Sequence, residues 1–489
     1  MHDSNLTTLD ALDNGASSLQ PLLPYIIALI VLLLPLTPYL CSSPEPPRGC
    51  RRLGTKKSNI ADEYDPQYSA GTPRDAIDPK TGLPAWRIKA LFTYPIKSCT
   101  GVELDSAEVI DTGLKYDRLF CFAEYIEAKQ PATTTTTTTT TSSHDNQSKE
   151  TGHWTARTLR DRHFCNLALV RPEIWVPDPT SPTYSPSLPE VQSQGVLVIH
   201  YPRTLGPGLA RLPLLPALFR LALTLGLLPR EESFRVPLDP HSDPKPTEEG
   251  EYRLRPVKIW KDTPLAHDYG HHLPASLRRF LADPTTTTTD AQKPLTLFRE
   301  SAAHHRPIFR NAPPKQQLGF QTVTGFQDAY PLHLLNLASV RDVAARCQTD
   351  IPRLTVRRFR ANVVVQGPGR FEEDAWRRVR VGGRVGFEGE DTGKEDEGVE
   401  IHLACRTMRC RLPNVDPDTG VRHRAEPDRT LKAYRRIDRG DPTNACLGMQ
   451  LVPAVRNFTL RVNDPITVLE TGEHCYIKML APGEVVEGV

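Results

Sequence analysis

Short runs of alternating apolar and polar residues recur from about residue 86 onward, and this pattern predicts β-strands. Helical spacing is rarer and predicts only short helices over 273–281 and 339–346. Strands this short and this frequent are typical of β-barrels with peripheral helices, so we expect an α+β fold. The main predicted strands are 87–94, 119–125, 195–201, 358–365, 376–381, 401–405 and 466–469.

The strongest apolar run lies near the N-terminus, at residues 22–40. A bilayer core about 30 Å thick needs roughly 20 apolar residues in a helix, and this run is just long enough. Acidic residues precede it, and Arg48, Arg51 and Arg52 follow it. The positive-inside rule then predicts a single-pass transmembrane helix with the large C-terminal part in the cytosol. The alternatives are a buried hairpin and a processed targeting segment.

The remaining chain divides by composition. Residues 1–21 are a polar tail, and residues 41–85, rich in Pro, Ser and charge, are predicted to be a flexible tether. We expect a first domain over 86–293, interrupted by threonine-rich low-complexity insertions, and a second domain over 294–489. The leucine-rich stretch 205–229 carries prolines and a central Arg220, which favours an amphipathic helix packed on the domain over a second membrane span.

Composition narrows the class of protein without identifying a site. The 489 residues are 38% hydrophobic and 24% charged, as in globular proteins, and 46 prolines indicate irregular insertions. A formal net charge of +2 gives no indication of nucleic-acid binding. Ten cysteines without a CxxC pair indicate reduced thiols rather than a disulfide scaffold.

One cysteine stands out because of its surroundings. Cys410 lies between Arg409 and Arg411 and is followed by Asn414-Val-Asp-Pro-Asp-Thr-Gly420, an acidic turn. Flanking guanidinium groups favour a thiolate, the form that binds a soft metal, and Asp, Pro and Gly hold a loop in a defined path. A buried structural thiol is the alternative, and Cys405 is the rival ligand five residues upstream.

Three further segments carry polar groups suited to an anionic ligand. Lys97 and Ser98 follow a predicted strand in Thr93-Tyr-Pro-Ile-Lys-Ser98, Arg118 ends Tyr116-Asp-Arg118, and Arg360 and Asn362 lie in Phe359-Arg-Ala-Asn362. Lysine and arginine suit a phosphate or pterin oxygen. On the residues alone, an exposed loop, a surface ion pair and a solvated strand edge are equally ordinary explanations.

The Lys-Ser loop and the Arg-Cys pair before Val-Asp-Pro-Asp-Thr-Gly together resemble the MOSC family of molybdenum-cofactor proteins, most closely the mitochondrial amidoxime-reducing components. The resemblance implies a MOSC N-terminal β-barrel-like domain followed by a MOSC β-barrel domain. It also implies that Cys410 ligates molybdenum and that the molybdenum cofactor is bound by Lys97, Ser98, Arg118, Arg360 and Asn362.

The resemblance further implies the chemistry. It points to a membrane-anchored oxidoreductase that reduces N-hydroxylated compounds with electrons from cytochrome b5 and NADH-cytochrome b5 reductase, with the mitochondrial outer membrane as one location. The alternative within the family is a non-redox cofactor or sulfur carrier, and a structural membrane protein with a decayed site is a third reading. Two departures weaken local details: Ala361 replaces the family's proline, and Asn336-Leu-Ala-Ser-Val340 replaces Ser-Glu-Ala-Ser-Leu.

Overall fold

The computed structural model describes residues 45–127, 152–161, 163–240, 252–282, 293–383 and 398–478. The predicted membrane run at 22–40 lies outside these ranges. Within them, no helix combines the length and the apolar character needed to cross a bilayer. The chain divides into two compact units, one with residues 45–46 and 202–232 and the other with residues 47–201 and 233–478.

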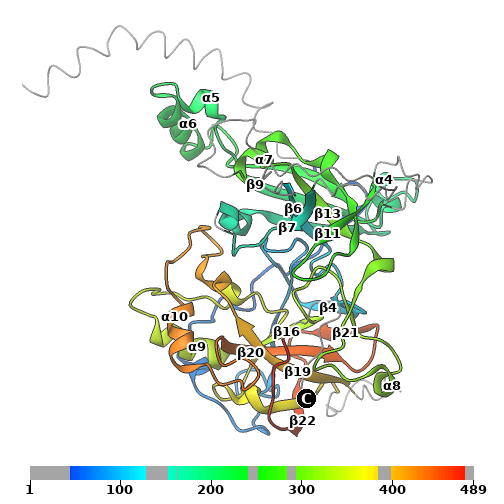
Figure 1. Cartoon of the computed structure of the whole chain (residues 1–489), viewed down its shortest axis with the longest axis vertical. Helices are drawn as coiled ribbons and strands as arrows, with labels where there is room; N and C mark the ends of the chain where they lie inside the picture. Colours follow the sequence, from blue (N-terminus) through cyan, green and yellow to red (C-terminus); the bar gives the residue numbers. More distant parts are fainter. Residues whose placement is uncertain are drawn as a thin grey trace, which may run out of the picture. The chain divides into compact units, whose positions relative to one another are not determined.

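The larger unit is built on a mixed eight-stranded sheet (Figure 1). Its central strands β16 and β17 run parallel, and the other neighbouring pairs are antiparallel. Apolar residues of β2 are buried on both faces of the sheet, which explains why apolar and polar residues alternate only loosely in its sequence. In sheet order the strands are β22 (Ile466–Thr471), β18 (Trp376–Val381), β19 (Val399–Arg409), β20 (Ala445–Pro453), β16 (Leu332–Asn336), β17 (Val363–Gln366), β2 (Arg87–Thr93) and β3 (Val102–Leu104).

A closed five-stranded barrel forms the second part of this unit. The parallel pairing of β7 with β11 closes it. Cys121, Ala266 and Phe298, from three of its strands, are fully buried in one apolar cluster. In order around the barrel the strands are β11 (Leu254–Lys258), β12 (Leu265–Asp268), β13 (Leu295–Glu300), β6 (Phe120–Glu127) and β7 (Gly152–Ala156).

The described residues also form three smaller sheets. They are the four-stranded sheet of β1 (Cys50–Arg52), β8 (Arg171–Pro177), β9 (Val196–Pro202) and β10 (Glu231–Pro237), the three-stranded sheet of β21 (Phe458–Arg461), β4 (Ser106–Ile110) and β5 (Gly113–Leu114), and the pair β14 (Arg306–Pro307) and β15 (Val323–Thr324).

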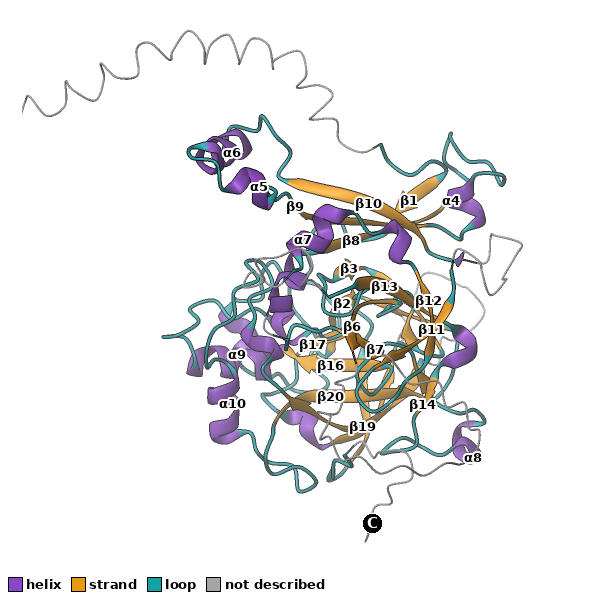
Figure 2. Ribbon diagram, turned by 45° about the horizontal axis from the view of Figure 1, so that its top comes forward, coloured by secondary structure: helices purple, strands orange, loops and turns teal. Residues whose placement is uncertain are grey.

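Short α-helices pack on the sheets, and 3-10 turns lie in the connections between elements. Helices α9 (Leu337–Arg346) and α10 (Asp428–Tyr434) lie side by side next to β16 and β20 (Figure 2). Asn336 begins α9 because its side chain accepts a hydrogen bond from the Ala338 N–H. The remaining α-helices of the larger unit are α4 (Pro189–Gln192), α7 (Ala275–Phe280) and α8 (Lys315–Leu318), and its 3-10 turns are η2 (Pro66–Ser69), η3 (His163–Leu169), η5 (Gly270–His272), η7 (Ala302–His304), η8 (Val356–Phe359), η9 (Glu372–Ala375) and η10 (Leu412–Asn414).

The strands predicted at 87–94, 119–125, 195–201, 376–381, 401–405 and 466–469 and both predicted helices are confirmed. The strand predicted over 358–365 is wrong in its first half. Its strand begins only at Val363, because residues 356–359 form η8 and Arg360 has a left-handed backbone with φ 56°.

The tether predicted over 41–85 is wrong where the structure describes it. Residues 50–52 form β1, which pairs with β8. Ile60 is buried in the core beside α9, and the buried Glu63 carboxylate accepts a hydrogen bond from the Val356 N–H at 2.8 Å. Proline and charge indicate irregular backbone, but irregular backbone can still be held by a few buried anchors.

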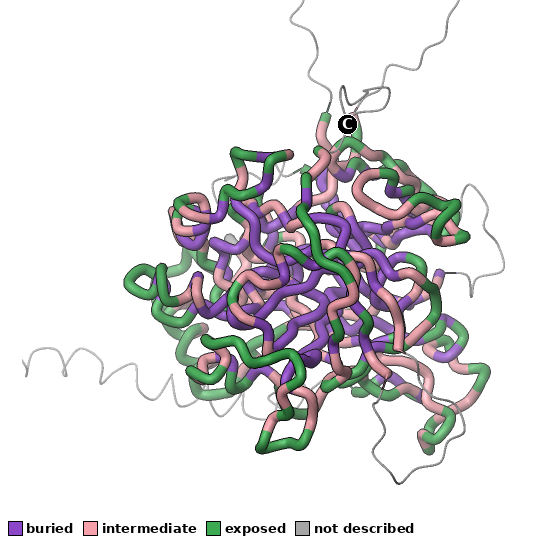
Figure 3. The backbone as a smooth tube through the Cα atoms, turned by 90° about the horizontal axis from the view of Figure 1, so that it is seen from below, coloured by how far each residue is buried: buried purple, intermediate pink, exposed green. Residues whose placement is uncertain are grey.

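The sheets also do not divide at the predicted boundary of residues 293 and 294. Strands β2 and β3 from the first predicted domain join the eight-stranded sheet, while β13 from the second completes the barrel. Buried positions fill the interior of the described molecule, and exposed segments surround them (Figure 3). Alternation predicts a strand but not its partner, which is why composition placed the boundary elsewhere.

The smaller unit contains α5 (Pro207–Ala210) and α6 (Leu215–Thr224). The helix expected in the leucine-rich stretch is therefore confirmed. Its expected packing on the domain stays a prediction, and within the smaller unit none of the ten residues of α6 is fully buried.

Candidate functional site

All six predicted site residues line one cavity of about 710 Å³ in the larger unit. They come from four segments that are far apart in the sequence and that the eight-stranded sheet and its loops bring together. The six are Lys97, Ser98, Arg118, Arg360, Asn362 and Cys410. Their shared position supports the grouping, while the role of each residue stays a prediction.

The lining of this cavity is strongly cationic. It contains nine lysine and arginine residues against two aspartates, Asp328 and Asp441. A wall with this charge balance favours an anionic occupant, and phosphate groups are the usual anions bound by such clusters. The nine are Lys97, Arg118, Arg160, Lys261, Arg310, Arg360, Arg406, Arg409 and Lys478.

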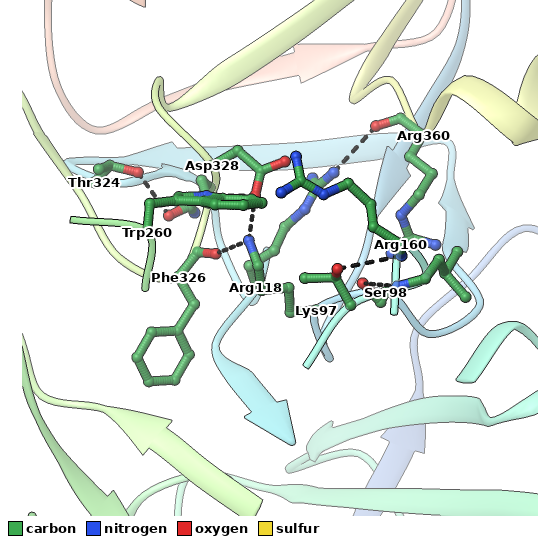
Figure 4. Close-up of polar contacts among 12 residues, drawn as sticks. Lys97, Ser98, Arg118, Arg160, Trp260, Thr324, Phe326, Asp328 and Arg360 are labelled. Atoms are coloured by element: carbon green, nitrogen blue, oxygen red, sulfur yellow. Dashed lines mark hydrogen bonds and ion pairs between the residues drawn. The ribbon is translucent and has the colours of Figure 1, made fainter. Parts of the chain in front are cut away.

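Lys97 and Ser98 lie in the loop after β2, and both are buried. The Lys97 Nζ donates to the Phe326 carbonyl at 2.8 Å and to Asp328 Oδ1 at 2.5 Å (Figure 4). Burial lowers the pKa of Lys97, and the Asp328 carboxylate opposes that shift. Ser98 has a left-handed backbone with φ 69°, and its Oγ accepts from the Leu159 N–H at 3.2 Å.

Arg118 and Arg360 form the next part of the wall and share an aromatic neighbour. Their guanidinium groups lie 4.5 Å and 4.2 Å from the centre of the Tyr94 ring. Arg118 also donates to both carboxylate oxygens of Asp117 and to the Arg360 carbonyl at 3.1 Å. Asp117 therefore neutralises Arg118 and fixes its direction.

Arg360 is held differently. Its Nη1 donates to the Cys99 carbonyl at 2.6 Å, whereas its Nη2 is buried and has no hydrogen-bond partner among the described residues. Burial and the nearby Arg118 charge lower the pKa of Arg360 to about 10. A buried donor without a partner is costly, so this atom is suited to an acceptor supplied by a ligand.

Asn362 lines the cavity, but its side chain also ties strands together. Its Nδ2 donates to the Phe92 carbonyl at 3.1 Å, and its Oδ1 accepts from the His333 N–H at 3.1 Å. It thus bridges β2 and β16 from the position just before β17. One amide N–H remains for a ligand, so a structural role accompanies any binding role.

Cys410 directly follows β19 and is partly exposed, whereas Cys405 is fully buried. Cys405 packs in an apolar cluster with Ile308, Ala404 and Val452, and burial raises its pKa to about 12. Cys410 lines the cavity, and Cys405 is not among the residues of that lining. The geometry therefore favours Cys410 over its rival as a ligand.

The two arginines that flank Cys410 have hydrogen-bond and ion-pair partners elsewhere. Arg409 is buried and donates to the Leu447 and Phe359 carbonyls and to His333 Nε2, the last at 2.6 Å. Arg411 is exposed and pairs with Asp428 at 3.4 Å. Within the described parts of the chain, no hydrogen bond joins either guanidinium to the Cys410 Sγ, but the Arg409 charge lies close enough to Cys410 for the two to interact electrostatically, so the predicted effect of the flanking arginines stays a prediction.

Burial lowers the pKa of Arg409 to about 9, and it lowers the pKa of His333 well below its ordinary value, with the Arg409 charge adding to that shift. His333 is therefore neutral and serves as an acceptor for Arg409. Sequence inspection did not single out His333, because a histidine within an apolar strand carries no motif.

The acidic turn after Cys410 is held rigidly, as predicted. Asp416 Oδ1 accepts from the backbone N–H groups of Asp418 and Thr419 at 3.0 Å each. Arg358 donates to Asp416 Oδ2 at 2.5 Å, and Arg357 forms two hydrogen bonds with Asp418. These contacts tie the Cys410 loop to η8, the turn that ends in Arg360.

Several lining residues escaped prediction. Arg160 lies 3.9 Å from the ring centre of Trp260, whose Nε1 donates to Asp328 at 3.2 Å (Figure 4). Trp260 has a left-handed backbone with φ 57°, an unusual conformation that signals a constrained position but leaves no trace in the sequence. By contrast, the doubt about residues 336–340 is supported, since none of them lines the cavity.

Two family models match this chain. Residues 85–141 match the MOSC N-terminal beta barrel domain, and residues 321–485 match the MOSC domain. The chain is 28% identical to mitochondrial amidoxime-reducing component 1 of Danio rerio over 241 residues, which cover 49% of this chain and 62% of that relative.

The human and mouse relatives of the same name match shorter stretches. The human protein is 30% identical over 32% of this chain and 40% of its own length, and the mouse protein 33% identical over 29% and 38%. Each of these three matches thus covers less than two thirds of the relative. A crystal structure of the YUAD protein from Bacillus subtilis aligns with 33% of this chain and 73% of its own at 13% identity and a TM-score of 0.17, a likeness too weak to inform the fold.

The matched segments contain every predicted site residue: Lys97, Ser98 and Arg118 in the first, and Arg360, Asn362 and Cys410 in the second. The cavity therefore lies where the two matched segments meet in the folded unit. Residues 85–141 and 321–485 of this chain thus match the MOSC N-terminal beta barrel domain and the MOSC domain, and the proteins similar to it include mitochondrial amidoxime-reducing components.

Proposed function

We propose that the chain binds the molybdenum cofactor in this cavity and reduces N-hydroxylated compounds such as amidoximes. The observation that carries the proposal is the meeting of Cys410, a thiol at the cavity wall, with a cluster of nine cationic side chains in one cavity. A thiol suits the soft metal, and the cations suit the phosphate and pterin oxygens of the same ligand.

The residues fit such a ligand in size and in chemistry. A volume of about 710 Å³ lies within the usual range for small-molecule sites. The buried Arg360 Nη2, which has no acceptor in the described parts of the protein, would gain one from an anionic group. Cys410 would hold the metal, while Lys97, Ser98, Arg118, Arg360 and the free N–H of Asn362 would hold the organic part.

When bound, the molybdenum cofactor supplies a two-electron redox centre. The protein's own contribution is to position it. The turn at residues 416–420, whose Asp416 accepts from Arg358 and from the Asp418 N–H, holds the Cys410 loop against η8. The position of the thiol relative to the Arg360 guanidinium is thereby fixed. His333 stays neutral and orients Arg409 at the base of the same loop.

The reaction consumes two electrons and two protons and turns an amidoxime into an amidine and water. By similarity to the amidoxime-reducing components, we propose that the electrons come from NADH through cytochrome b5 reductase and cytochrome b5. We further propose that the run at residues 22–40 anchors the chain in a membrane with the catalytic part in the cytosol.

The test uses the full chain, produced in cells that make the cofactor. We expect the purified protein to contain molybdenum and to reduce an amidoxime when NADH, cytochrome b5 and its reductase are supplied. Absence of both molybdenum and reduction would overturn the proposal. Molybdenum without reduction would support the alternative of a non-redox cofactor carrier.

A further inference from the structure

The smaller unit exposes an apolar surface unlike the rest of the described molecule. Seven of the thirteen exposed large apolar residues in the described chain lie between Leu209 and Leu227. This segment contains α5 and α6, which contact each other as a helical hairpin. Soluble proteins rarely leave so many neighbouring leucines in water, so the concentration points to a binding surface.

The exposed leucines follow the helical repeat of α6. Leu214 is the N-cap of α6 and has a left-handed backbone, and Leu218, Leu221 and Leu225 follow it at spacings of four, three and four residues, which aligns these last three along one face. In chain order the four leucines have exposed fractions of 77%, 57%, 52% and 63%. We call these four residues the leucine stripe.

The charges beside the stripe are all of one sign. Arg211, Arg220 and Arg230 are exposed, and no aspartate or glutamate occurs between Arg203 and Arg230. Basic side chains beside an apolar helix face are typical of segments that lie in the interface of a membrane with anionic lipids. The nearest acidic residues, Glu231 and Glu232, follow the hairpin in the sequence.

The length of α6 decides how a membrane would be engaged. Ten residues extend about 15 Å, half of the roughly 30 Å bilayer core, so the helix can lie on a membrane but cannot cross it. Gly226, with φ 72°, directly follows the last leucine of the stripe and allows the chain to turn back after the helix. The leucine stripe is therefore presented by one short helix and its two cap residues.

A second copy of the chain is the rival occupant, since the stripe also has coiled-coil spacing. Stable coiled coils need three or four heptads, and α6 offers fewer than two. Self-association would also bring arginines together without acidic partners in the hairpin. An anionic lipid surface satisfies both the leucines and the arginines.

We propose that the α5–α6 hairpin inserts its leucine stripe into the interface of a membrane that contains anionic lipids. The proposal is independent of the cofactor and of the run at residues 22–40. It predicts contact between the stripe and lipid chains, whichever segment anchors the protein.

The test places a tryptophan on the stripe of the full chain. The variant Leu218→Trp is mixed with vesicles of phosphatidylcholine and phosphatidylserine in which the lipid chains are brominated near their upper end. We expect these chains to quench most of the fluorescence that the variant adds over the natural chain. The matched control is Phe309→Trp, because Phe309 is 76% exposed but lies in the larger unit, and its added fluorescence should be unchanged.

A second set of variants tests the role of the arginine charge. It also repeats the quenching at another position of the stripe, in case the first variant folds poorly. Leu221→Trp should repeat the quenching. Adding Arg220→Gln to this variant should raise the lipid concentration needed for half of the quenching about fivefold, as expected for the loss of one arginine at an anionic surface. Arg424→Gln, an exposed arginine outside the hairpin, should have no effect. Unquenched fluorescence at both positions would overturn the proposal, and a doubled mass with unquenched fluorescence would assign the stripe to a second copy.

Discussion

The cationic wall of the cavity has two regions that are held in different ways. In one, Lys97 pairs with Asp328 and Arg118 pairs with Asp117, so carboxylates balance the positive charges. In the other, Arg360 and Arg409 are held by carbonyl oxygens and a neutral histidine. We call these the carboxylate-paired region and the carbonyl-held region.

The difference shows where an anion would gain most. Burial lowers the pKa of Arg360 to about 10 and that of Arg409 to about 9, and neither guanidinium has a carboxylate as a hydrogen-bond partner among the described residues. An anionic ligand would offset the cost of burying these charges in the carbonyl-held region. In the carboxylate-paired region it would have to compete with Asp328 and Asp117. We therefore expect the carbonyl-held region, with Cys410 beside it, to dominate cofactor retention.

The largest expected effect comes from Cys410. Replacing Cys410 with Ser should remove the soft ligand and lower both molybdenum content and amidoxime reduction by more than about a hundredfold, since loss of outer-shell partners alone reaches about 10–100-fold. Metal analysis and an NADH-coupled assay check this. Cys405→Ser is the matched control, because Cys405 is buried outside the cavity. Molybdenum retained in the Cys410 variant but lost in the Cys405 variant would transfer the ligand role to Cys405.

The next effect tests Arg360. Replacing Arg360 with Ala should lower cofactor affinity at least about tenfold, because a hydrogen bond to a charged group contributes about 1.5–3 kcal/mol. Cofactor content after gel filtration measures it. Arg456→Ala is the matched control, since Arg456 lies outside the cavity lining and pairs at the surface with Asp111, where loss costs less than about 1 kcal/mol. Equal losses in the two variants would remove Arg360 from the binding role.

The sequence predicted the positions of the strands better than it predicted how the strands pair. The apolar runs of β6 and β9 and the alternation of β2 and β18 were sufficient to locate strands, because each strand buries at least one face. Which strands pair was not predictable, and β13 joins the barrel although it lies beyond the expected domain boundary. Long-range pairing depends on the partner surface, which local alternation does not encode.

For the site, the motifs identified Lys97, Arg118, Arg360 and Cys410, and the structure brings them into one cavity. The motifs did not reveal which cations are neutralised. Asp328 lies more than two hundred residues from Lys97 in the sequence, and no pattern links the two. The division into two regions is a tertiary property.

The third prediction concerns His333, which anchors Arg409 in the carbonyl-held region. Burial holds the pKa of His333 well below its ordinary value, so the folded state keeps the ring neutral while the unfolded chain takes up a proton below about pH 6.5. Stability is therefore complete above about pH 6.5 and falls as the pH is lowered, by up to about 1.4 kcal/mol per pH unit.

Urea unfolding of the full chain at about pH 7.5 and about pH 5.5, on either side of the ordinary histidine pKa, measures this dependence. His333→Gln keeps an acceptor for Arg409 without a titrating group, and it should show a shallower decline. The same slope in the variant and the natural chain would mean that another group dominates.

The smallest expected effect tests the carboxylate-paired region. Asp328→Asn removes the counter-charge of Lys97, whose Nζ would keep only the Phe326 carbonyl. Because the Asp328 side chain is 58% exposed, solvent screens the pair, and we expect the cofactor-free protein to lose about 1 kcal/mol of unfolding free energy. The freed ammonium should then attract the anionic ligand more strongly, so the cofactor-bound protein should lose less. Unfolding curves of the two forms separate these cases: an equal loss with and without cofactor would show that Lys97 does not face the bound anion.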